Sequence, residues 1–199
     1  MNRFSGVLLG LLLSSPVIAD DDVVRVSMST AMGDIEIELY AGKAPVTVAN
    51  FLQLVDGGHL DGGSFYRVVT RENDNGQPKI EVIQGGRGAA ESPLPPIEHE
   101  TTQQTGILHT DGVISMARGD VGTATSEFFI CIGDQPGLDF GNTRNADKQG
   151  FAAFGKVVGG MDVVRRIQQA PADGPSESAY TRGQLLTEPV EIVRVRRVN

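Results

Sequence analysis

Cysteine, histidine and tryptophan are scarce in this chain of 199 residues, which has one cysteine, three histidines and no tryptophan. A single cysteine cannot form a disulfide within the chain, so the fold must depend on its hydrophobic core. Cys131 follows the apolar residues Phe-Phe-Ile, where we expect a buried side chain and not a reactive thiol. His59, His99 and His109 lack the spacing of metal ligands, so we expect them in loops and at the surface, with no metal site.

Positive charge is also in short supply. The chain has 17 lysines and arginines against 25 aspartates and glutamates, and its formal net charge is −8. Proteins that bind nucleic acid do so largely by neutralising phosphates with lysine and arginine, often with aromatic side chains interleaved. No such basic stripe is present in the sequence, so nucleic acid is not an expected partner.

Long apolar runs are missing after the N-terminus. The run Val7–Leu13 is shorter than the roughly 20 apolar residues that span a bilayer. A basic residue precedes it and the small residues Val17 and Ala19 follow it, which is typical of a secretory signal. We therefore predict a signal peptide over residues 1–19, cleaved after Ala19, and a periplasmic or otherwise exported domain over residues 20–199 that is not bound to a membrane. A retained anchor or a buried N-terminal helix is the alternative.

Short strands dominate the rest of the chain. Val23–Thr30 and Ile35–Tyr40 alternate apolar and polar residues around a turn containing glycine and aspartate, which predicts a hairpin. The apolar side of each strand should cover the core while the other side faces water. Further short strands are expected at Ser64–Val69, Glu81–Gln84, Val113–Ala117, Glu127–Ile132, Phe151–Val157 and Pro189–Val198.

Two segments have the periodicity of helices. Pro45 suits the first position of a helix that ends at the glycines after Asp56, and Met161–Gln168 has an apolar stripe at helical spacing. We predict a mainly β fold, a closed eight-stranded antiparallel β-barrel capped by two α-helices. Three polar or proline-rich stretches are expected to be loops: Arg71–Lys79, Glu91–Thr105 and Gly141–Gln149.

An ordered set of motifs resembles the cyclophilin family of peptidyl-prolyl isomerases over roughly Val23 to the C-terminus. Each motif is weak alone, but their order and spacing together are specific. They are Ala44–Phe51 (APVTVANF), Gly62–Val68 (GGSFYRV), Val82–Gly86 (VIQGG), Gly112–Arg118 (GVISMAR), Ser126–Ile130 (SEFFI), Leu138-Asp139, Phe151–Val157 (FAAFGKV) and Gly160–Val164 (GMDVV).

The resemblance implies a peptidyl-prolyl cis-trans isomerase, of the EC 5.2.1.8 class, that accelerates the folding of exported proteins. The C–N bond before proline has partial double-bond character, so its rotation is slow. A fixed cation that donates a hydrogen bond to the prolyl nitrogen would stabilise the twisted transition state more than either planar ground state. This chemistry needs no cofactor, metal or nucleophile. The expected partners are proline-containing polypeptide segments, and we expect a monomer.

The family's catalytic residues fall on three positions of this sequence. Arg67, in the motif Phe-Tyr-Arg, matches the catalytic arginine. Gln84 matches the glutamine that holds the substrate carbonyl, and its amide can both donate and accept hydrogen bonds. Phe129 matches the floor of the pocket for the proline ring. For each residue a purely structural role, as a surface ion pair, a turn residue or a core side chain, is the alternative.

Seven further residues are expected to contact the substrate. Val82 and Leu138 should form walls of the pocket, and an extended peptide should lie along Ala117 and the backbone of Arg118 as an added strand. Glu127 could pair with Arg67 or Arg118, or compete with the substrate for the guanidinium. The full set by resemblance is Phe65, Val82, Ala117, Arg118, Glu127, Leu138 and Phe151.

The sequence also departs from the family pattern around the site. Glu81 followed by Val82 replaces the usual Phe followed by Met, and the polar stretch before it is longer than usual, which should thin one pocket wall. Phe151 takes the place of a pocket histidine. Gly137 stands where many eukaryotic members have tryptophan, so we expect poor affinity for cyclosporin.

Two other functions remain open from the sequence. The first is a non-catalytic peptide-binding or chaperone module on the same fold, in which the change at Glu81 and Val82 has abolished turnover. The second is an unrelated small-ligand barrel of the lipocalin type. A lipocalin-like barrel would enclose an apolar cavity, whereas a cyclophilin-like barrel would have a packed interior and a groove outside.

Overall fold

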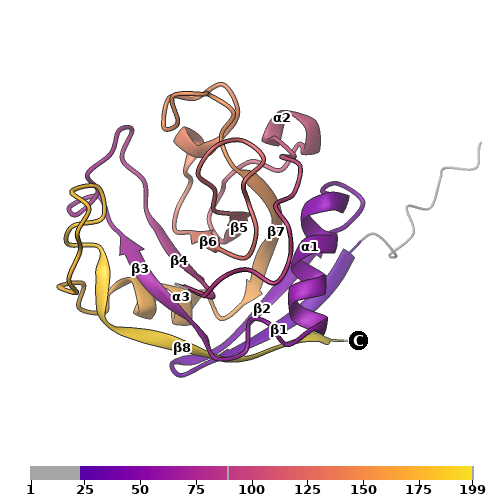
Figure 1. Cartoon of the computed structure of the whole chain (residues 1–199), viewed down its shortest axis with the longest axis horizontal. Helices are drawn as coiled ribbons and strands as arrows, with labels where there is room; N and C mark the ends of the chain where they lie inside the picture. Colours follow the sequence, from indigo (N-terminus) through magenta and orange to yellow (C-terminus); the bar gives the residue numbers. More distant parts are fainter. Residues whose placement is uncertain (1–22, 89, 199) are drawn as a thin grey trace, which may run out of the picture.

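The structure of this chain is a computed structural model that describes residues 23–88 and 90–198 (Figure 1). The predicted signal peptide and its cleavage site lie outside the described residues.

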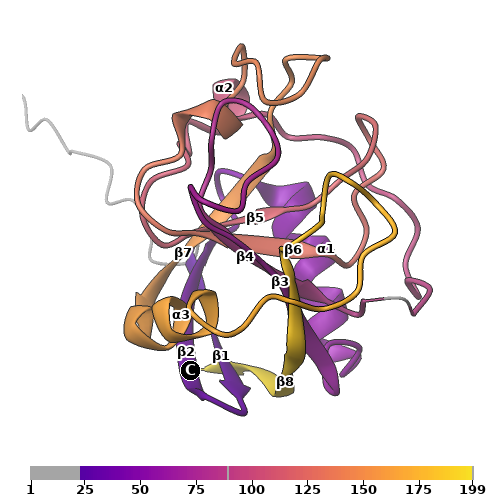
Figure 2. The ribbon, with the colours of Figure 1, turned by 90° about the vertical axis from the view of Figure 1, so that its left-hand side faces the viewer.

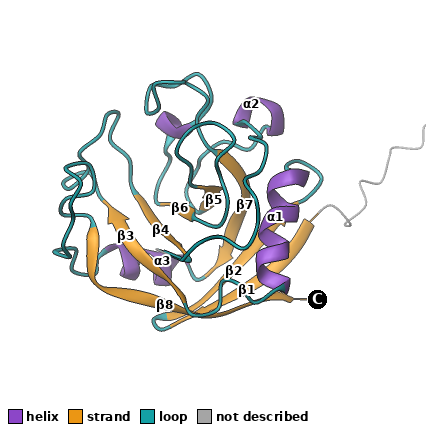
Figure 3. Ribbon diagram, viewed as in Figure 1, coloured by secondary structure: helices purple, strands orange, loops and turns teal. Residues whose placement is uncertain are grey.

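Eight strands close into an antiparallel barrel, as the sequence predicts (Figure 3). Around the barrel the order is β1-β2-β7-β5-β6-β4-β3-β8, so β1 and β8 pair and close the ring. The strands are β1 (Val23–Thr30), β2 (Gly33–Tyr40), β3 (Gly63–Val69), β4 (Val82–Gly86), β5 (Val113–Met116), β6 (Phe128–Cys131), β7 (Ala152–Gly159) and β8 (Leu185–Val198).

Strand β8 begins four residues earlier than expected. We predicted a start at Pro189, but Leu185 already pairs with Arg67 of β3. The intervening residues do not alternate clearly between apolar and polar, so the partner strand and not the local pattern determines where β8 begins.

The two predicted helices lie at opposite ends of the barrel (Figures 1 and 2). They are α1 (Pro45–Asp56), with proline in its first turn, and α3 (Met161–Gln168). Among the described residues no helix is both long enough and apolar enough to cross a membrane.

A third helix occurs in a stretch that the sequence assigns to a loop. Helix α2 (Thr102–Thr105) has only four residues, too few for a recognisable hydrophobic period. Its start is defined instead by a capping box, in which Thr101 and Gln104 satisfy each other's backbone N–H groups. A turn of 3-10 helix, η2 (Pro136–Leu138), lies near the site described below.

The barrel interior is packed with side chains and not hollow. The rings of Phe51 and Phe65 both meet the ring of Phe128 edge to face, with centroids 5.7 Å apart in each pair. All three rings are completely buried. A filled interior is inconsistent with a lipocalin-type ligand cavity, so the third sequence hypothesis is disfavoured.

Candidate active site

A pocket of about 130 Å³ lies outside the barrel, beside strands β3, β4 and β6. All the catalytic and substrate-contact residues expected from the sequence line it except Phe65 and Glu127. Three residues that the sequence did not suggest also line it. The full lining is Arg67, Ile80, Val82, Gln84, Ala117, Arg118, Phe129, Leu138, Arg144, Phe151 and Tyr180.

Apolar rings form the floor of the pocket. Phe129 meets Phe151 edge to face, with the ring centroids 5.2 Å apart. Val82 and Leu138 are buried with Phe129 in a small cluster separate from the barrel core, and Cys131 lies in the same cluster. Burial raises the pKa of the Cys131 thiol, which agrees with a packing role for this residue. Such a floor suits an apolar ring without hydrogen-bond donors.

Strand β6 explains how adjacent phenylalanines serve two regions. Phe128 points into the barrel core and Phe129 belongs to the pocket cluster, because successive side chains of a strand face opposite sides. The sequence predicts one ring on each side, with Phe129 in the groove, and the two rings lie in this way in the structure.

The structure corrects the expectation for Phe65. Its side chain is completely buried in the barrel core, so it cannot contact a substrate. Regular alternation would place Phe65 and Arg67 on the same face of β3. The register shifts between them against both neighbouring strands, with Phe65 opposite Gly85 and Arg67 opposite Gln84. This bulge at Tyr66 turns Arg67 to the pocket while Phe65 stays inside.

Arg67 is held by neutral side chains. Its Nη1 donates to Oε1 of Gln84 at 2.8 Å, while Nε and Nη2 donate to Oε1 of Gln184 at 2.9 and 2.7 Å. The guanidinium carbon also lies 5.2 Å from the ring centroid of Tyr180, within the range of a cation–π contact. Within the described part of the chain no carboxylate forms an ion pair with Arg67.

Among the described residues, Glu127 forms no hydrogen bond or ion pair with the side chain of Arg67 or Arg118, the two partners that the sequence suggested. Its Oε2 accepts a hydrogen bond of 2.7 Å from the Tyr66 hydroxyl, and its Oε1 accepts one of 2.8 Å from the backbone N–H of Arg87. It does not line the pocket, because the bulged Tyr66 and not Arg67 reaches it. Burial, together with the Glu127 charge, raises the pKa of Tyr66.

Tyr66 in turn orients the amide of Gln84. Nε2 of Gln84 donates to the Tyr66 oxygen at 2.9 Å, while its Oε1 accepts from Arg67. Because the Tyr66 proton is directed to the Glu127 carboxylate, the tyrosine oxygen can only accept from Gln84. Glu127 therefore acts on the pocket indirectly, by fixing which end of the Gln84 amide faces Arg67.

The side chain of Arg118 forms part of the frame of the site. Its guanidinium donates to the carbonyl of Gly150 and forms a bidentate pair with Asp147, at 2.8 and 2.9 Å. It lies over the ring of Phe151, 5.3 Å from the centroid. The hydrogen bond from Arg118 lowers the pKa of Asp147. Its charge is thus already paired, which agrees with the expectation that a peptide meets the backbone here.

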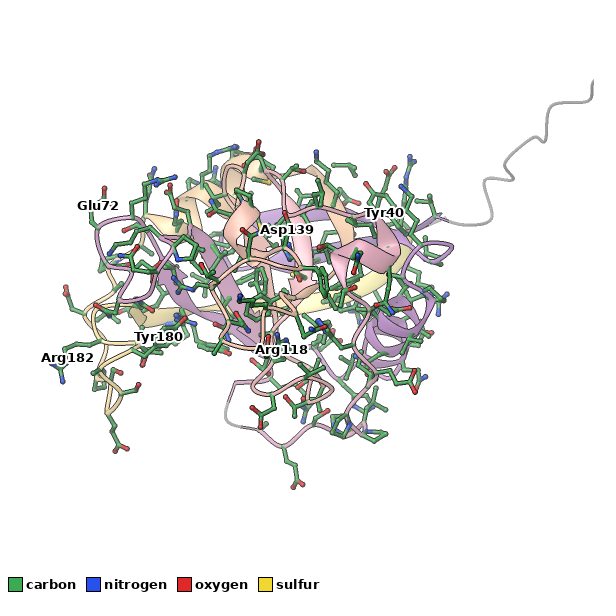
Figure 4. All side chains as sticks on the ribbon, turned by 90° about the horizontal axis from the view of Figure 1, so that it is seen from above. Tyr40, Glu72, Arg118, Asp139, Tyr180 and Arg182 are labelled. Carbon is green, nitrogen blue, oxygen red and sulfur yellow. The ribbon has the colours of Figure 1, made fainter. Side chains whose placement is uncertain are left out.

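Two of the lining residues, Ile80 and Tyr180, lie outside the motifs recognised in the sequence. Ile80 precedes β4, and Tyr180 comes from the segment after α3, a hundred residues further along the chain. The Tyr180 oxygen accepts a 2.7 Å hydrogen bond from Arg144. Figure 4 shows Tyr180 on one loop and Arg118 on another, with Arg182 pointing away from the protein. Tyr180 lies in a polar, aperiodic stretch, so no sequence signal indicated it.

Arg144 belongs to a buried ion pair that sequence reasoning also missed. It binds Asp74 with two hydrogen bonds of 2.7 and 2.9 Å, and both side chains are almost inaccessible to solvent. Burial by itself would raise the pKa of Asp74. The hydrogen bonds from Arg144 and from the backbone of Gly76 and Ile80 outweigh burial and lower it.

His109 is buried, which corrects the expectation of a surface histidine. Its two ring nitrogens contact Asp139 Oδ1 at 2.7 Å and Ser115 Oγ at 3.0 Å, and its ring stacks beneath Phe129. A Ser-His-Asp arrangement can carry out nucleophilic catalysis, but Ser115 has no exposed surface. These residues therefore support the floor of the pocket. Across the described residues no three potential metal ligands cluster together.

The fold and the pocket together define a class of protein: a packed, closed barrel with a pocket on its outer face. The family model "Cyclophilin type peptidyl-prolyl cis-trans isomerase/CLD" matches residues 24–197. The chain belongs to this family of cyclophilin-type isomerases.

Individual relatives agree with this assignment. The chain is 36% identical to a peptidyl-prolyl cis-trans isomerase of Acinetobacter baylyi, over 98% of this chain and 95% of the relative. It is 35% identical to peptidyl-prolyl cis-trans isomerase A of Dickeya dadantii, over 87% of each chain. A crystal structure of a Cryptosporidium parvum cyclophilin superposes with a TM-score of 0.68, covering 89% of this chain and 98% of that chain at 19% identity, and thus supports the fold.

Proposed function

We propose that this protein accelerates Xaa-Pro isomerisation in exported polypeptides, with Arg67 as the group that acts on the prolyl nitrogen. Its membership of the isomerase family supports the reaction. The observation that best supports this role is that the charge of Arg67 is not paired with a carboxylate in the described structure. Three guanidinium groups line the pocket, and those of Arg118 and Arg144 are each paired with an aspartate, whereas Arg67 is held by amide oxygens.

This arrangement supports the following mechanism. The proline ring would lie on Phe129, next to Arg67, with the preceding residues along Ala117 and Arg118. As the bond twists, conjugation is lost and the lone pair localises on nitrogen, where it can accept a hydrogen bond. A hydrogen bond from an N–H of Arg67 to this nitrogen would be stronger in the transition state than in either planar state. Catalysis requires such a difference. Gln84 would hold a substrate carbonyl.

Substitution of Arg67 tests the proposal. We expect Arg67→Ala to lower kcat/KM for a short Xaa-Pro peptide by roughly 100-fold, the usual cost of removing a donor directed at a transition state. Phe129→Ala should also lower kcat/KM, because the proline ring of the substrate would lose the surface on which it packs. The rate is measured in a protease-coupled assay, and thermal unfolding confirms that each variant is folded.

Arg165→Ala provides the matched control. Arg165 is a half-exposed arginine paired with Asp111 on the surface, and its loss should leave the rate unchanged. If Arg67→Ala is as active as the parent, the assignment of the catalytic group is wrong. A parent protein that binds proline peptides without turnover would instead favour the second candidate, a non-catalytic peptide-binding or chaperone module.

Export and processing are a separate part of the proposal. The N-terminal sequence supports a signal peptide over residues 1–19 and a mature protein in the periplasm or an equivalent exported compartment. There the clients would be proteins whose folding waits on a slow proline bond.

A further inference from the structure

Gln184 lies behind Arg67 and has no exposed surface. Its Oε1 accepts hydrogen bonds from Nε and Nη2 of Arg67, at 2.9 and 2.7 Å, and its Nε2 donates to the backbone carbonyl of Asn73 at 2.8 Å. Its own carbonyl accepts from the backbone N–H of Val68 in β3, at 2.8 Å. A residue so enclosed cannot touch a substrate and can act only through Arg67.

The orientation of the Gln184 amide is imposed by Asn73. A backbone carbonyl can only accept a hydrogen bond, so the NH₂ end of the amide must face it and the oxygen must face Arg67. Asn73 is itself fixed, because its Nδ2 donates to the carbonyls of Val68 and Gly183 at 3.2 and 3.0 Å. The acceptor that Arg67 meets is therefore rigid.

Two N–H donors of the Arg67 guanidinium are not used by Gln84 or Gln184. A guanidinium carries five N–H donors. Gln184 takes one from Nε and one from Nη2, and Gln84 takes one from Nη1. One donor on Nη1 and one on Nη2 remain, held in a fixed plane by three bonds to the protein.

The chemical nature of Gln184 matters as much as its position. A glutamate at this place would form a bidentate ion pair with the guanidinium, like those of Arg118 and Arg144 in the same pocket. Such a pair would neutralise the charge of the guanidinium and so weaken its electrostatic effect on the substrate. An amide oxygen fixes the same edge of the guanidinium without cancelling its charge.

We infer that Gln184 is a positioning residue, which fixes the guanidinium of Arg67 while leaving its positive charge available to the prolyl nitrogen. The inference rests on the proposed function of Arg67 and adds a second requirement to it: the group must be both immobile and unneutralised.

Two substitutions separate these requirements. Gln184→Glu supplies a carboxylate, so the guanidinium of Arg67 stays fixed but its charge is neutralised. Gln184→Met has a similar volume but no acceptor, so the charge of Arg67 remains while its guanidinium is free to move. We expect each to lower kcat/KM by about tenfold or more, the scale of one charge-assisted hydrogen bond. The Nε–H signal of Arg67 in ¹⁵N NMR reports position directly. It should persist in Gln184→Glu and broaden or disappear in Gln184→Met.

Gln168 provides the matched control. It is also buried, and its Nε2 donates to a backbone carbonyl, that of Val69, at 3.0 Å. The changes Gln168→Glu and Gln168→Met disturb a comparable bond without touching Arg67. They should leave kcat/KM within about twofold of the parent and the Arg67 signal unchanged. If the Gln184 variants lost activity only through a general loss of stability, the Gln168 variants would lose it as well.

The outcomes are distinct. Equal losses in the Gln168 and Gln184 variants, or parental activity in Gln184→Met, would overturn the inference while an inactive Arg67→Ala still upheld the proposed function. Parental activity in Gln184→Glu with an intact Arg67 signal would also overturn it. If Gln184→Glu does not fold, Gln184→Met and its NMR signal decide. An Arg67→Ala variant as active as the parent refutes the function itself.

Discussion

At the scale of single residues, the neighbours of a side chain determine what it can do. Arg67, Arg118 and Arg144 line one pocket, yet only Arg67 has neutral partners in the described structure. The other two support the walls. A cationic group acts on a substrate only if its charge is not already paired, which is why the identity of Gln84 and Gln184 as amides is important.

Gly137 is also constrained by its neighbours, and it stands at the position where the resemblance places a tryptophan in many eukaryotic members. A Cβ placed on Gly137 would lie 2.5 Å from Cγ of Pro78, a contact that real Cβ atoms do not make. We therefore expect Gly137→Ala to destabilise the protein by about 1–3 kcal/mol, the usual cost of overpacking. Gly137→Trp should not create a cyclosporin site. Thermal unfolding and inhibition by cyclosporin measure the two effects.

Gly119→Ala is the control for this prediction. A Cβ there would meet only the Thr123 hydroxyl at 3.6 Å, an ordinary contact, so stability should be nearly unchanged. Tight, stoichiometric inhibition of the parent by cyclosporin would contradict the expected poor affinity. Strong inhibition of Gly137→Trp alone would show that Pro78 can move aside.

At the scale of elements, three segments far apart in the sequence are joined beside the pocket. Figure 1 shows the segment before β4 and the segment before β8 at the same side of the barrel. Asn75 donates to the carbonyls of Tyr180 and Arg182, and Arg144 connects Asp74 with the Tyr180 hydroxyl. These contacts hold Tyr180 where it forms part of the pocket wall.

Removing the charge of Asp74 should weaken this assembly. We expect Asp74→Asn to lower the free energy of unfolding at pH 7 by roughly 3 kcal/mol, since Arg144 would remain as an uncompensated buried charge. The folded-state pKa of Asp74 is lowered, so its contribution is complete above the unfolded pKa of about 3.9 and is lost as pH falls through the folded value. Parent and variant should therefore converge below about pH 4.

Chemical denaturation at several pH values measures this difference. Asp162→Asn serves as the control, because Asp162 pairs with Arg166 at an exposed position of α3 and its loss should have little effect at any pH. A gap between the parent and Asp74→Asn that stays constant down to pH 3 would show that the Asp74 charge is not the cause.

At the scale of the whole molecule, a closed barrel with a packed interior has no room inside for a ligand. The candidate site therefore lies on the outside, where strands β3, β4 and β6 present Arg67, Gln84 and Phe129. Pairing of the described strands all round the barrel also removes free sheet edges, through which separate chains could otherwise associate.

Export can be tested on the full-length protein. When the chain is expressed in a bacterium with its own N-terminus, we expect it in the periplasmic fraction, with Asp20 as the first residue by N-terminal sequencing or intact mass. The short apolar run and the small residues at 17 and 19 are the physical reason. Changing Ala19 to Arg should block cleavage. Full-length protein in the cytoplasm would refute the signal peptide.

The sequence by itself determined the barrel, the two longer helices and most of the pocket. Strand alternation and helical spacing are local patterns, and Arg67, Gln84 and Phe129 lie within recognisable motifs. Phe65 lies in the core and not at the pocket, because the bulge after it depends on how β3 pairs with its neighbours and not on the sequence pattern of β3 itself.

Only the tertiary structure decided how the guanidinium of Arg67 is held. Gln184 lies 117 residues from Arg67, and Tyr180 lies in a stretch without periodicity. Glu127 was a candidate partner for arginine from its sequence position, but the fold directs it to Tyr66. Side-chain hydrogen bonds between distant segments form only after the strands have brought those segments together. Composition and local spacing therefore do not predict them.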